Sequence, residues 1–401
     1  MAGNANRAPL PAEGLEAALR RFGESRMLPR PAYVDQAVFD WEQRHLFRGG
    51  WTCVARSEEI GDVGDQRAES VGTAGVFLVR AEDGKLRGFA NTCRHRGHEL
   101  LACGESRNLP IVVCPYHSWS YRLDGALRNA PRFDGCDAFD PEDHGLVELP
   151  AEEWHGLVFV DASGGAPPLA EHFAGLEALV AGHEPERLRE ADHHDYTVAA
   201  NWKVVIENYQ ECYHCAVIHP ELCRVSPPRS GDNYQVPGAG AWVGGWMALR
   251  DEVQTMSLSG TSDATVLRGL DARARRQVVY LVLVPNVLLS LHPDYVMTHL
   301  LTPLGPDRTR VRCSCAFSPE DLGRPGFDPG GAVDFWDITN RQDWAACESV
   351  QRGLASEHWV PGPLAPDEDG VYQFVTMMAR AYQGLALRAG PVPVASWYGR
   401  H

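Results

Sequence analysis

Two short cysteine–histidine motifs constrain the fold of this chain more than any other feature of its sequence. The first is Cys93-x-His95 and the second is Cys114-x-x-His117, with 18 residues between them. Thiolate and imidazole together are typical ligands of zinc and of iron–sulfur centres. Two loops that each carry one thiolate and one imidazole can close over a single compact centre. The chain is therefore expected to fold these two loops against each other.

Short strand-like runs surround the two motifs. Residues 51–161 consist of β-branched and aromatic runs separated by Gly, Asp and Pro, which is typical of a small antiparallel β domain. Helical patterns precede this region, and the Gly- and Pro-rich segment 163–168 follows it. The remaining sequence mixes helical and strand-like patterns and ends in helical ones at 333–354 and 371–387. We predict three parts: a helical lead-in (1–48) that packs on the third part, a β domain (49–162) and a larger domain (163–401).

Two kinds of metal centre fit the first ligand set. A structural zinc uses the same ligand types, but zinc modules rarely begin with Cys-x-His, whereas a Rieske [2Fe–2S] cluster binds one iron through two cysteines and the other through two histidines. The runs NTCRHRGHEL and CPYHSWSYRLDG resemble the Rieske domain of Rieske non-haem iron oxygenases. The resemblance implies that Cys93, His95, Cys114 and His117 bind a [2Fe–2S] cluster.

The stretch 207–220, ENYQECYHCAVIHP, is the second candidate site. A helix is expected from about Lys203 through His214. His214 and His219 are five residues apart and do not share one face of a regular helix, so the helix must break between them, and Pro220 supports an ending there. Two histidines and one carboxylate on one side of an iron leave other positions free for dioxygen and substrate. The stretch therefore predicts a mononuclear Fe(II) site.

The carboxylate ligand must come from elsewhere in the chain, and the C-terminal run FWDITNRQDWAACESVQRGL offers Asp337, Asp343 and Glu348. In the family that this run resembles, the ligand is an aspartate a few residues before a Glu-x-x-Gln-x-Gly pattern, which here begins at Glu348. Asp343 fits this position best and Asp337 is the reserve. The other reading of either residue is an exposed acid in the first turn of a helix.

The same resemblance gives Glu211 a role of its own. In the family, an acid at this position lies between the Rieske histidine of one subunit and an iron ligand of the next. Glu211 as such a bridge implies a ring-like homo-oligomer, commonly a trimer. The other reading of Glu211 is an acid on a helix surface.

The resemblance covers most of the chain and implies both fold and activity. It implies an α+β protein with a small antiparallel Rieske domain and a catalytic domain whose antiparallel sheet is covered by helices, a helix-grip or START-like fold. It also implies the terminal oxygenase (alpha) subunit of a Rieske monooxygenase or dioxygenase. Electrons from NAD(P)H would arrive through a flavin and iron–sulfur reductase or a ferredoxin, pass through the cluster and reach the Fe(II) that activates dioxygen.

The substrate is less well defined by the sequence. The segment ENYQECYHC is similar to the one found in the branch of the family that acts on quaternary ammonium compounds. This branch includes glycine betaine, carnitine and choline monooxygenases and stachydrine demethylase. Monooxygenation or N-dealkylation of a small betaine-type substrate is therefore expected. One alternative is hydroxylation or demethylation of an aromatic compound, and a second is an electron-transfer Rieske protein, although an electron carrier needs no iron with open positions. A methylammonium group favours a box of aromatic faces, but core packing is the commoner role of the candidates Tyr209, Tyr234, Trp242, Trp246 and Tyr280.

Composition excludes several partners and suggests a location. The formal net charge of −16 disfavours binding to nucleic acid or to an anionic membrane. The apolar runs are shorter than the ~18 residues of a membrane span and the N-terminus lacks a signal-peptide pattern, so a cytoplasmic protein is expected. Cys212 and Cys215 have Cys-x-x-Cys spacing, but no βαβ pattern accompanies them. We predict that both are packing residues, although nearby oxygen chemistry makes their oxidation possible.

Overall fold

The chain folds into two units. One unit is Glu42–Leu169, and the other combines Met1–Trp41 with Ala170–His401. The computed structural model describes residues 6–235 and 240–389. Within these residues, no helix combines the length and the apolar content that crossing a bilayer requires. The domain limits after residues 48 and 162 stay predictions, because a unit of the fold need not end where a domain of a family does.

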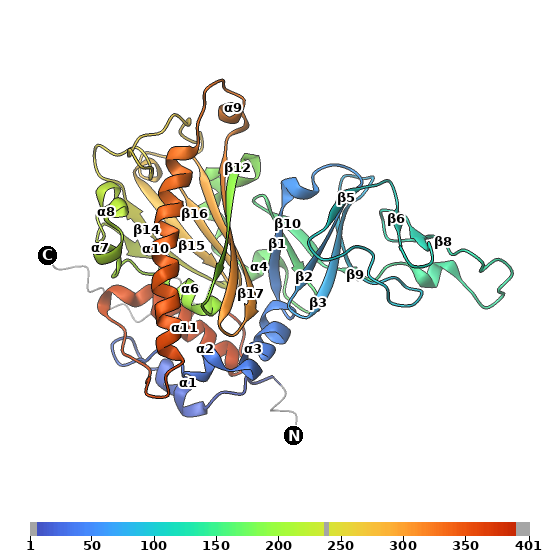
Figure 1. Ribbon diagram of the computed structural model, residues 1–401, viewed down its shortest axis with the longest axis horizontal. Coiled ribbons are helices and arrows are strands. Elements are labelled where there is room, and N and C mark those ends of the chain that lie inside the picture. Colours follow the sequence, from blue (N-terminus) through green and yellow to red (C-terminus); the bar gives the residue numbers. More distant parts are fainter. Residues whose placement is uncertain (1–5, 236–239, 390–401) are drawn as a thin grey trace. The chain divides into compact units, whose positions relative to one another are not determined.

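Three antiparallel sheets make up the unit Glu42–Leu169 (Figure 1). Their strand orders are β5-β2-β3-β4-β9, β1-β11-β10 and β6-β7-β8. The strands are β1 (Trp51–Arg56), β2 (Asp65–Val71), β3 (Ala74–Arg80), β4 (Leu86–Ala90), β5 (Ser106–Asn108), β6 (Val112–Val113), β7 (Ser120–Tyr121), β8 (Leu127–Asn129), β9 (Glu148–Leu149), β10 (Ala151–Trp154) and β11 (Leu157–Asp161). The predicted small antiparallel β domain is confirmed.

A two-residue turn joins β2 to β3, whose last paired residues are Val71 and Ala74. Gly72 has a φ of +57°, which L-residues with a side chain rarely adopt. A Cβ atom on Gly72 would also lie 2.1 Å from the backbone oxygen of Gln43. Glycine is therefore required here both by the turn and by the close approach of the chain.

The other unit is built on a seven-stranded antiparallel sheet with the order β12-β18-β17-β16-β15-β14-β13. Its strands are β12 (Arg189–Val198), β13 (Asp232–Asn233), β14 (Trp242–Ala248), β15 (Gln277–Leu283), β16 (Val287–Leu291), β17 (Val296–Gly305) and β18 (Arg308–Phe317). Every residue of β16 is buried, as is expected of a central strand covered on both faces.

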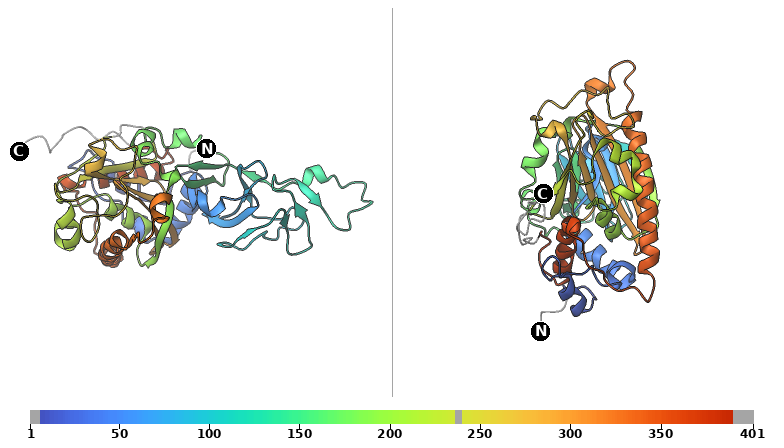
Figure 2. Two further views of the ribbon diagram at one scale, coloured as in Figure 1. Left: turned by 90° about the horizontal axis from the view of Figure 1, so that it is seen from above. Right: turned by 90° about the vertical axis from the view of Figure 1, so that its left-hand side faces the viewer.

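Helices cover this sheet. Helix α10 (Gly330–Leu354) runs along one face (Figure 2), where Phe335 and Trp336 share a core cluster with Val278, Met297 and Phe317 of the strands. The other α-helices of the unit are α1 (Ala12–Ala18), α2 (Pro31–Val34), α5 (Glu177–Val180), α6 (Trp202–Tyr209), α7 (Cys215–Ile218), α8 (Pro220–Val225), α9 (Pro319–Leu322) and α11 (Asp369–Tyr382). Helices α3 (Gln36–Glu42) and α4 (Leu169–His172) lie at the two points where the chain passes from one unit to the other. The α+β prediction with a helix-covered antiparallel sheet is confirmed.

Glu207 of α6 makes the stability of the fold depend on pH. Its side chain is buried and accepts a hydrogen bond from the Tyr33 hydroxyl at 2.7 Å. Burial raises the pKa of Glu207 from 4.5 to about 8. Because the folded pKa lies above the unfolded one, the folded state holds the proton more tightly. The stabilisation is therefore complete below about pH 4.5 and is lost as the pH rises to about 8.

We expect Glu207→Gln to flatten this dependence. Glutamine keeps the acceptor for Tyr33 and never has to ionise, so the fall in unfolding free energy between pH 5 and pH 8 should shrink by about 2–4 kcal/mol. Urea titrations across this pH range measure the effect. The control is Glu16→Gln, at an exposed position of α1. An unchanged slope in Glu207→Gln would show that another group carries the dependence.

Candidate active site

The two cysteine–histidine motifs lie on tight turns in the unit Glu42–Leu169. The first turn follows β4, and the backbone N–H of Cys93 donates to the oxygen of His98 at 2.8 Å. The second lies between β6 and β7, and the N–H of Cys114 donates to the oxygen of Trp119 at 2.8 Å. These bonds turn the chain back directly after each cysteine, so each turn presents its cysteine and its histidine together.

The four side chains of these turns come together in two layers. Cys93 and Cys114 are buried, with 3% and 2% exposure, and their thiols interact with each other. His95 and His117 lie further out, with ring centroids 4.8 Å apart. Loss of hydration, followed by the charge of His95, lowers the pKa of His117, which favours the neutral imidazole that binds metals. Two thiols inside and two imidazoles outside match the ligand pairing of a Rieske cluster.

Two aromatic residues support these turns. Trp119 is buried and stacks on His95, with centroids 5.0 Å apart and an interplanar angle of 7°. The Tyr121 hydroxyl accepts from the N–H of Arg94 at 3.0 Å and lies 3.2 Å from the Cys93 sulfur, to which it can donate. Hydrogen bonds to the sulfurs tune the potential of such a cluster. Sequence reasoning missed Tyr121, although its position two residues after Trp119 places both side chains on one face of an extended segment.

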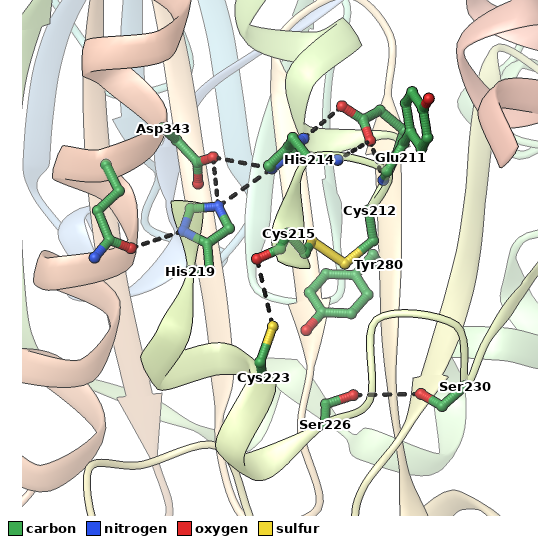
Figure 3. The surroundings of a disulfide bond; sticks show 12 residues. Glu211, Cys212, His214, Cys215, His219, Cys223, Ser226, Ser230, Tyr280 and Asp343 are labelled. Carbon is green, nitrogen blue, oxygen red and sulfur yellow. Dashed lines mark hydrogen bonds and ion pairs between the residues drawn. A yellow bond between two sulfur atoms is a disulfide. The ribbon is translucent and has the colours of Figure 1, made fainter. Parts of the chain in front are cut away.

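The second ligand set lies in the other unit. The Nε2 atoms of His214 and His219 are 3.2 Å apart, and the Asp343 Oδ1 atom lies 3.4 Å and 2.9 Å from them (Figure 3). One potential ligand atom from each of the three residues lies within 4.8 Å of the others. The structure thus brings together the two histidines and the aspartate that the sequence predicted.

The backbone explains how two histidines five residues apart converge. The helix expected from about Lys203 through His214 is shorter than predicted, because α6 ends at Tyr209 and α7 begins only at Cys215. In the turn between them, the Glu211 carboxylate accepts from the backbone N–H groups of Tyr213 and His214. His219 separates α7 from α8 with a φ of −118°, and Pro220 begins α8. The predicted helix ending beside Pro220 is confirmed, but the four residues between the histidines are themselves helical, and the break lies at His219 instead of between the two.

The ring nitrogens opposite the convergence point are held by acceptors. His214 Nδ1 contacts a carboxylate oxygen of Glu211, and His219 Nδ1 lies 2.7 Å from the Gln342 Oε1 atom. Each Nδ1 can therefore donate a hydrogen to its acceptor, and the Nε2 atom of each ring, which faces Asp343, is the atom that a metal would bind in exchange for a proton. Ligand atoms about 2.1 Å from one cation at neighbouring positions lie roughly 3 Å apart, which is the spacing found here. The three residues therefore fit a divalent metal.

Charge at this point is strongly favourable to a cation. Burial lowers the pKa of His214, but the hydrogen bonds of Asp343 and Glu211 outweigh it and raise the pKa to about 9. Burial raises the pKa of Asp343, but its bonds to the two histidines hold it below the usual value. The pocket wall is thus built to hold positive charge between the imidazoles and the carboxylate.

Helix α10 decides which aspartate reaches the histidines. Asp337 and Asp343 are six residues apart, so their side chains leave the helix about 120° apart. Asp337 instead accepts from the Tyr196 hydroxyl at 2.7 Å and pairs with Arg341 at 2.8 Å. The pattern that begins at Glu348 is structural: Glu348 accepts from the N–H of Ala199 at 3.1 Å, which ties α10 to the chain just before α6.

A pocket of about 610 Å³ opens onto the three residues. Its lining, within the described part of the chain, includes four carboxylates (Glu211, Asp232, Asp343, Asp367) and one guanidinium (Arg229). Its aromatic residues are Tyr209, Tyr213, Trp246, Tyr280, Trp336 and Trp344.

Three of the five aromatic candidates for a substrate box line this pocket, namely Tyr209, Trp246 and Tyr280. Trp242 is used elsewhere, because it is 2% exposed and donates to the oxygen of Ala174 at 2.9 Å. Tyr234 also lies outside the described lining. Trp336 and Trp344 were missed, although both stand close to Asp343 on the predicted C-terminal helix.

Two ligand sets of these kinds define a protein with an iron–sulfur centre and a separate open metal site. Residues 50–140 match the family described as Rieske [2Fe-2S] domain, and residues 185–384 match the family described as ring hydroxylating alpha subunit (catalytic domain). The chain is 30% identical over 394 residues to the glycine betaine monooxygenase oxygenase subunit of Chromohalobacter salexigens, covering 90% of this chain and 88% of that one. It is 29% identical over 374 residues to the carnitine monooxygenase oxygenase subunit of Escherichia coli K12, covering 90% and 95%.

Solved structures show the same fold. A quaternary ammonium Rieske monooxygenase, described in terms of carnitine oxidation and inter-subunit electron transfer, superposes with a TM-score of 0.78 at 24% identity, covering 94% of this chain and all of that one. Naphthalene 1,2-dioxygenase from Rhodococcus superposes with a TM-score of 0.76 at 18% identity, covering 93% and 98%. This chain belongs to the Rieske non-haem iron oxygenases, as a terminal oxygenase alpha subunit with a [2Fe–2S] domain and a mononuclear iron domain.

Proposed function

We propose that this oxygenase acts on a small quaternary ammonium compound of the betaine type, by monooxygenation or N-dealkylation. The observation that carries the proposal is the lining of the pocket beside Asp343, which has four carboxylates, one guanidinium and a group of aromatic rings. The guanidinium, Arg229, is paired with Asp367 at 3.4 Å. A pocket with carboxylates and aromatic walls attracts a cation, and a quaternary ammonium group keeps its positive charge there because it has no N–H proton to transfer to a carboxylate. Relatives named for glycine betaine and carnitine oxidation support the same substrate class.

Three of the aromatic rings that line the pocket form a connected group. The ring of Tyr280 lies 5.8 Å from that of Tyr209 and 6.5 Å from that of Trp336, both edge to face. The Tyr280 hydroxyl points to the Met256 sulfur at 3.1 Å, and the Tyr209 hydroxyl bonds to Ser290 at 2.8 Å. Because both hydroxyls are engaged within the protein, the rings rather than the polar tips are available to a methylammonium group.

In the proposal, Fe(II) is bound by His214, His219 and Asp343. The [2Fe–2S] cluster is bound by Cys93, His95, Cys114 and His117. Iron bound there would supply the activation of dioxygen. Glu211 and Gln342 hold the two imidazoles in the required tautomer, and the aromatic walls orient the substrate and exclude water. Glu211 is proposed to lie on the path by which electrons pass from the cluster of a neighbouring subunit to this iron site.

The proposed reaction balances with dioxygen, two electrons and two protons. One oxygen atom enters a C–H bond next to nitrogen, and the other leaves as water. The new hydroxyl group then loses its proton to water, and the hydroxylated carbon leaves as an aldehyde, with the C–N bonding pair remaining on nitrogen. We further propose that an NAD(P)H-dependent reductase or a ferredoxin donates the electrons. The proposed assembly is a homotrimer, and the proposed location is the cytoplasm.

A matched pair of ligands tests the substrate class. Glycine betaine and 3,3-dimethylbutanoate have the same shape and the same carboxylate, but only the first carries a positive charge. We expect the anaerobic holoenzyme to bind the betaine about 5–30-fold more tightly in calorimetric titrations, because of the cation–π term. Tyr280→Leu should largely remove this ratio, and Tyr280→Phe, which keeps the ring, should preserve it.

Equal affinity of the wild-type protein for both ligands would contradict the proposal. Coupled NADH consumption and product formation with simple aromatic acids, combined with no turnover of betaine, carnitine or choline, would favour hydroxylation or demethylation of an aromatic compound instead. A protein that retained two cluster irons but bound no mononuclear iron after anaerobic reconstitution would favour a plain electron carrier.

A further inference from the structure

A disulfide bond lies in the wall of the same pocket. Cys212 and Cys215 are joined to each other, whereas the other nine cysteines are free thiols. The prediction that both are packing residues therefore missed their bond, although Cys215 does belong to the core cluster, with 3% exposure. The sequence signal was present in the Cys-x-x-Cys spacing, which is typical of pairs that form a disulfide reversibly.

The two cysteines of the disulfide lie on either side of His214 in the sequence. His214 lies inside the ring that the disulfide closes, and the backbone oxygen of Cys215 accepts from the N–H of His219 at 3.0 Å. Figure 3 shows the two sulfurs next to the Tyr280 ring, with Glu211 and His214 on one side of them. Cys212 and Cys215 both line the pocket that contains Asp343. Both cysteines therefore border the space into which small molecules formed beside Asp343 would be released.

Stabilisation of the fold is a poor explanation for this disulfide. The stabilisation that a disulfide provides through the unfolded chain grows with the length of the closed loop, and this loop has only two residues between its cysteines. The turn is already closed by the N–H of Cys215, which donates to the oxygen of Cys212 at 3.2 Å, and by the carboxylate of Glu211. A chemical role fits the position better than a structural one.

We propose that Cys212 and Cys215 form a reversible dithiol–disulfide site that reduces hydrogen peroxide released into the pocket. Peroxide is the two-electron reduction product of dioxygen when no C–H bond accepts an oxygen atom. Cys212 is the more exposed of the two and attacks first, breaking the O–O bond to give a sulfenic acid and water. Cys215 then attacks that sulfur, the S–S bond forms and a second water leaves. A small dithiol returns the two electrons, and the inference does not depend on the identity of the organic substrate.

The free thiol of Cys223 provides an internal comparison. It donates to the oxygen of Cys215 at 3.4 Å and lies on α8, and burial raises the pKa of its thiol. Cleavage after Lys203 and Arg224 releases one peptide that contains Cys212, Cys215 and Cys223 and no other cysteine. After alkylation, this peptide carries three alkyl groups in the reduced protein and one in the protein with the proposed disulfide.

The test starts from holoenzyme reduced anaerobically with a dithiol, which is then removed. One equivalent of hydrogen peroxide is added, and the sample is alkylated at intervals and analysed by mass spectrometry. We expect the singly alkylated peptide to form at least about tenfold faster than the exposed Cys103 is oxidised, because the second thiol is held beside the first. Cys223→Ser should behave like the wild type. Cys212→Ser should form no disulfide, and this half-buried position tolerates the change better than the buried Cys215.

Three results would overturn the inference. They are sulfinic or sulfonic acid at Cys212 or Cys215 instead of a disulfide, a bond to Cys223, or oxidation no faster than at Cys103. A second arm supplies NADH, a surrogate reductase and dioxygen without organic substrate, with catalase in the solution. Formation of the disulfide despite catalase supports peroxide released within the pocket, and complete protection by catalase contradicts it.

Discussion

Asp343→Ala is expected to yield a folded protein that keeps its [2Fe–2S] cluster and loses its mononuclear iron. The carboxylate oxygen of Asp343 contacts both Nε2 atoms, at 2.9 Å and 3.4 Å, and it supplies the negative charge at their meeting point, whereas Glu211 faces the opposite nitrogen of His214. Its removal leaves two neutral ligands. Because even supporting residues of metal sites affect affinity 10–100-fold, we expect iron affinity and turnover to fall by more than about 100-fold.

Asp337→Ala is the matched control for this prediction. Asp337 lies on the same helix but bonds to Tyr196 and Arg341. Its loss should cost about 1 kcal/mol of stability and leave the iron bound. Iron analysis after anaerobic reconstitution, together with the visible spectrum of the cluster, distinguishes the two variants. Iron retained by Asp343→Ala and lost by Asp337→Ala would reverse the assignment.

Glu211→Gln is expected to keep both metals and to slow oxidation of the reduced cluster in single turnover with substrate. One oxygen of Glu211 faces His214 Nδ1, and the other accepts from two backbone N–H groups. Glutamine has only one acceptor oxygen and no charge, so it cannot serve both partners. We expect the transfer rate to fall about 10–100-fold, with partial recovery in Glu211→Asp, which restores the charge. Unchanged single-turnover kinetics in Glu211→Gln would remove Glu211 from the path.

Mixed oligomers test whether this path crosses between subunits. One subunit carries Asp343→Ala and has an intact cluster, and the other carries Cys93→Ser and has an intact iron site. Neither variant turns over alone if both centres are needed. Co-assembly should restore turnover if electrons pass from the cluster of one subunit to the iron of its neighbour. Absence of recovery in oligomers shown to contain both subunits would place the path within one chain.

Local spacing made much of the fold and the site predictable. Cys-x-His and Cys-x-x-His specify a ligand pairing within a few residues, and the five-residue interval between His214 and His219 excludes a continuous helix. Both are short-range properties of the chain. The end of α6 at Tyr209 was not predicted. The turn after it is held by the carboxylate of Glu211, which accepts hydrogen bonds from backbone N–H groups that would bond to carbonyl oxygens in a continuing helix.

The sequence by itself determined the two kinds of ligand set, the antiparallel β domain around the first and the break in the chain at the second, since these depend on residue types at short spacing. Only the tertiary structure shows that Asp343, and not Asp337, lies beside the histidines, because one helix carries both and the side of α10 that faces the histidines depends on contacts such as the bond from Ala199 to Glu348. It also decided that Gln342 holds His219 and that Trp336 and Trp344 line the pocket. The physical reason is that each of these choices depends on how α10 is rotated against segments more than a hundred residues away, which no local pattern records.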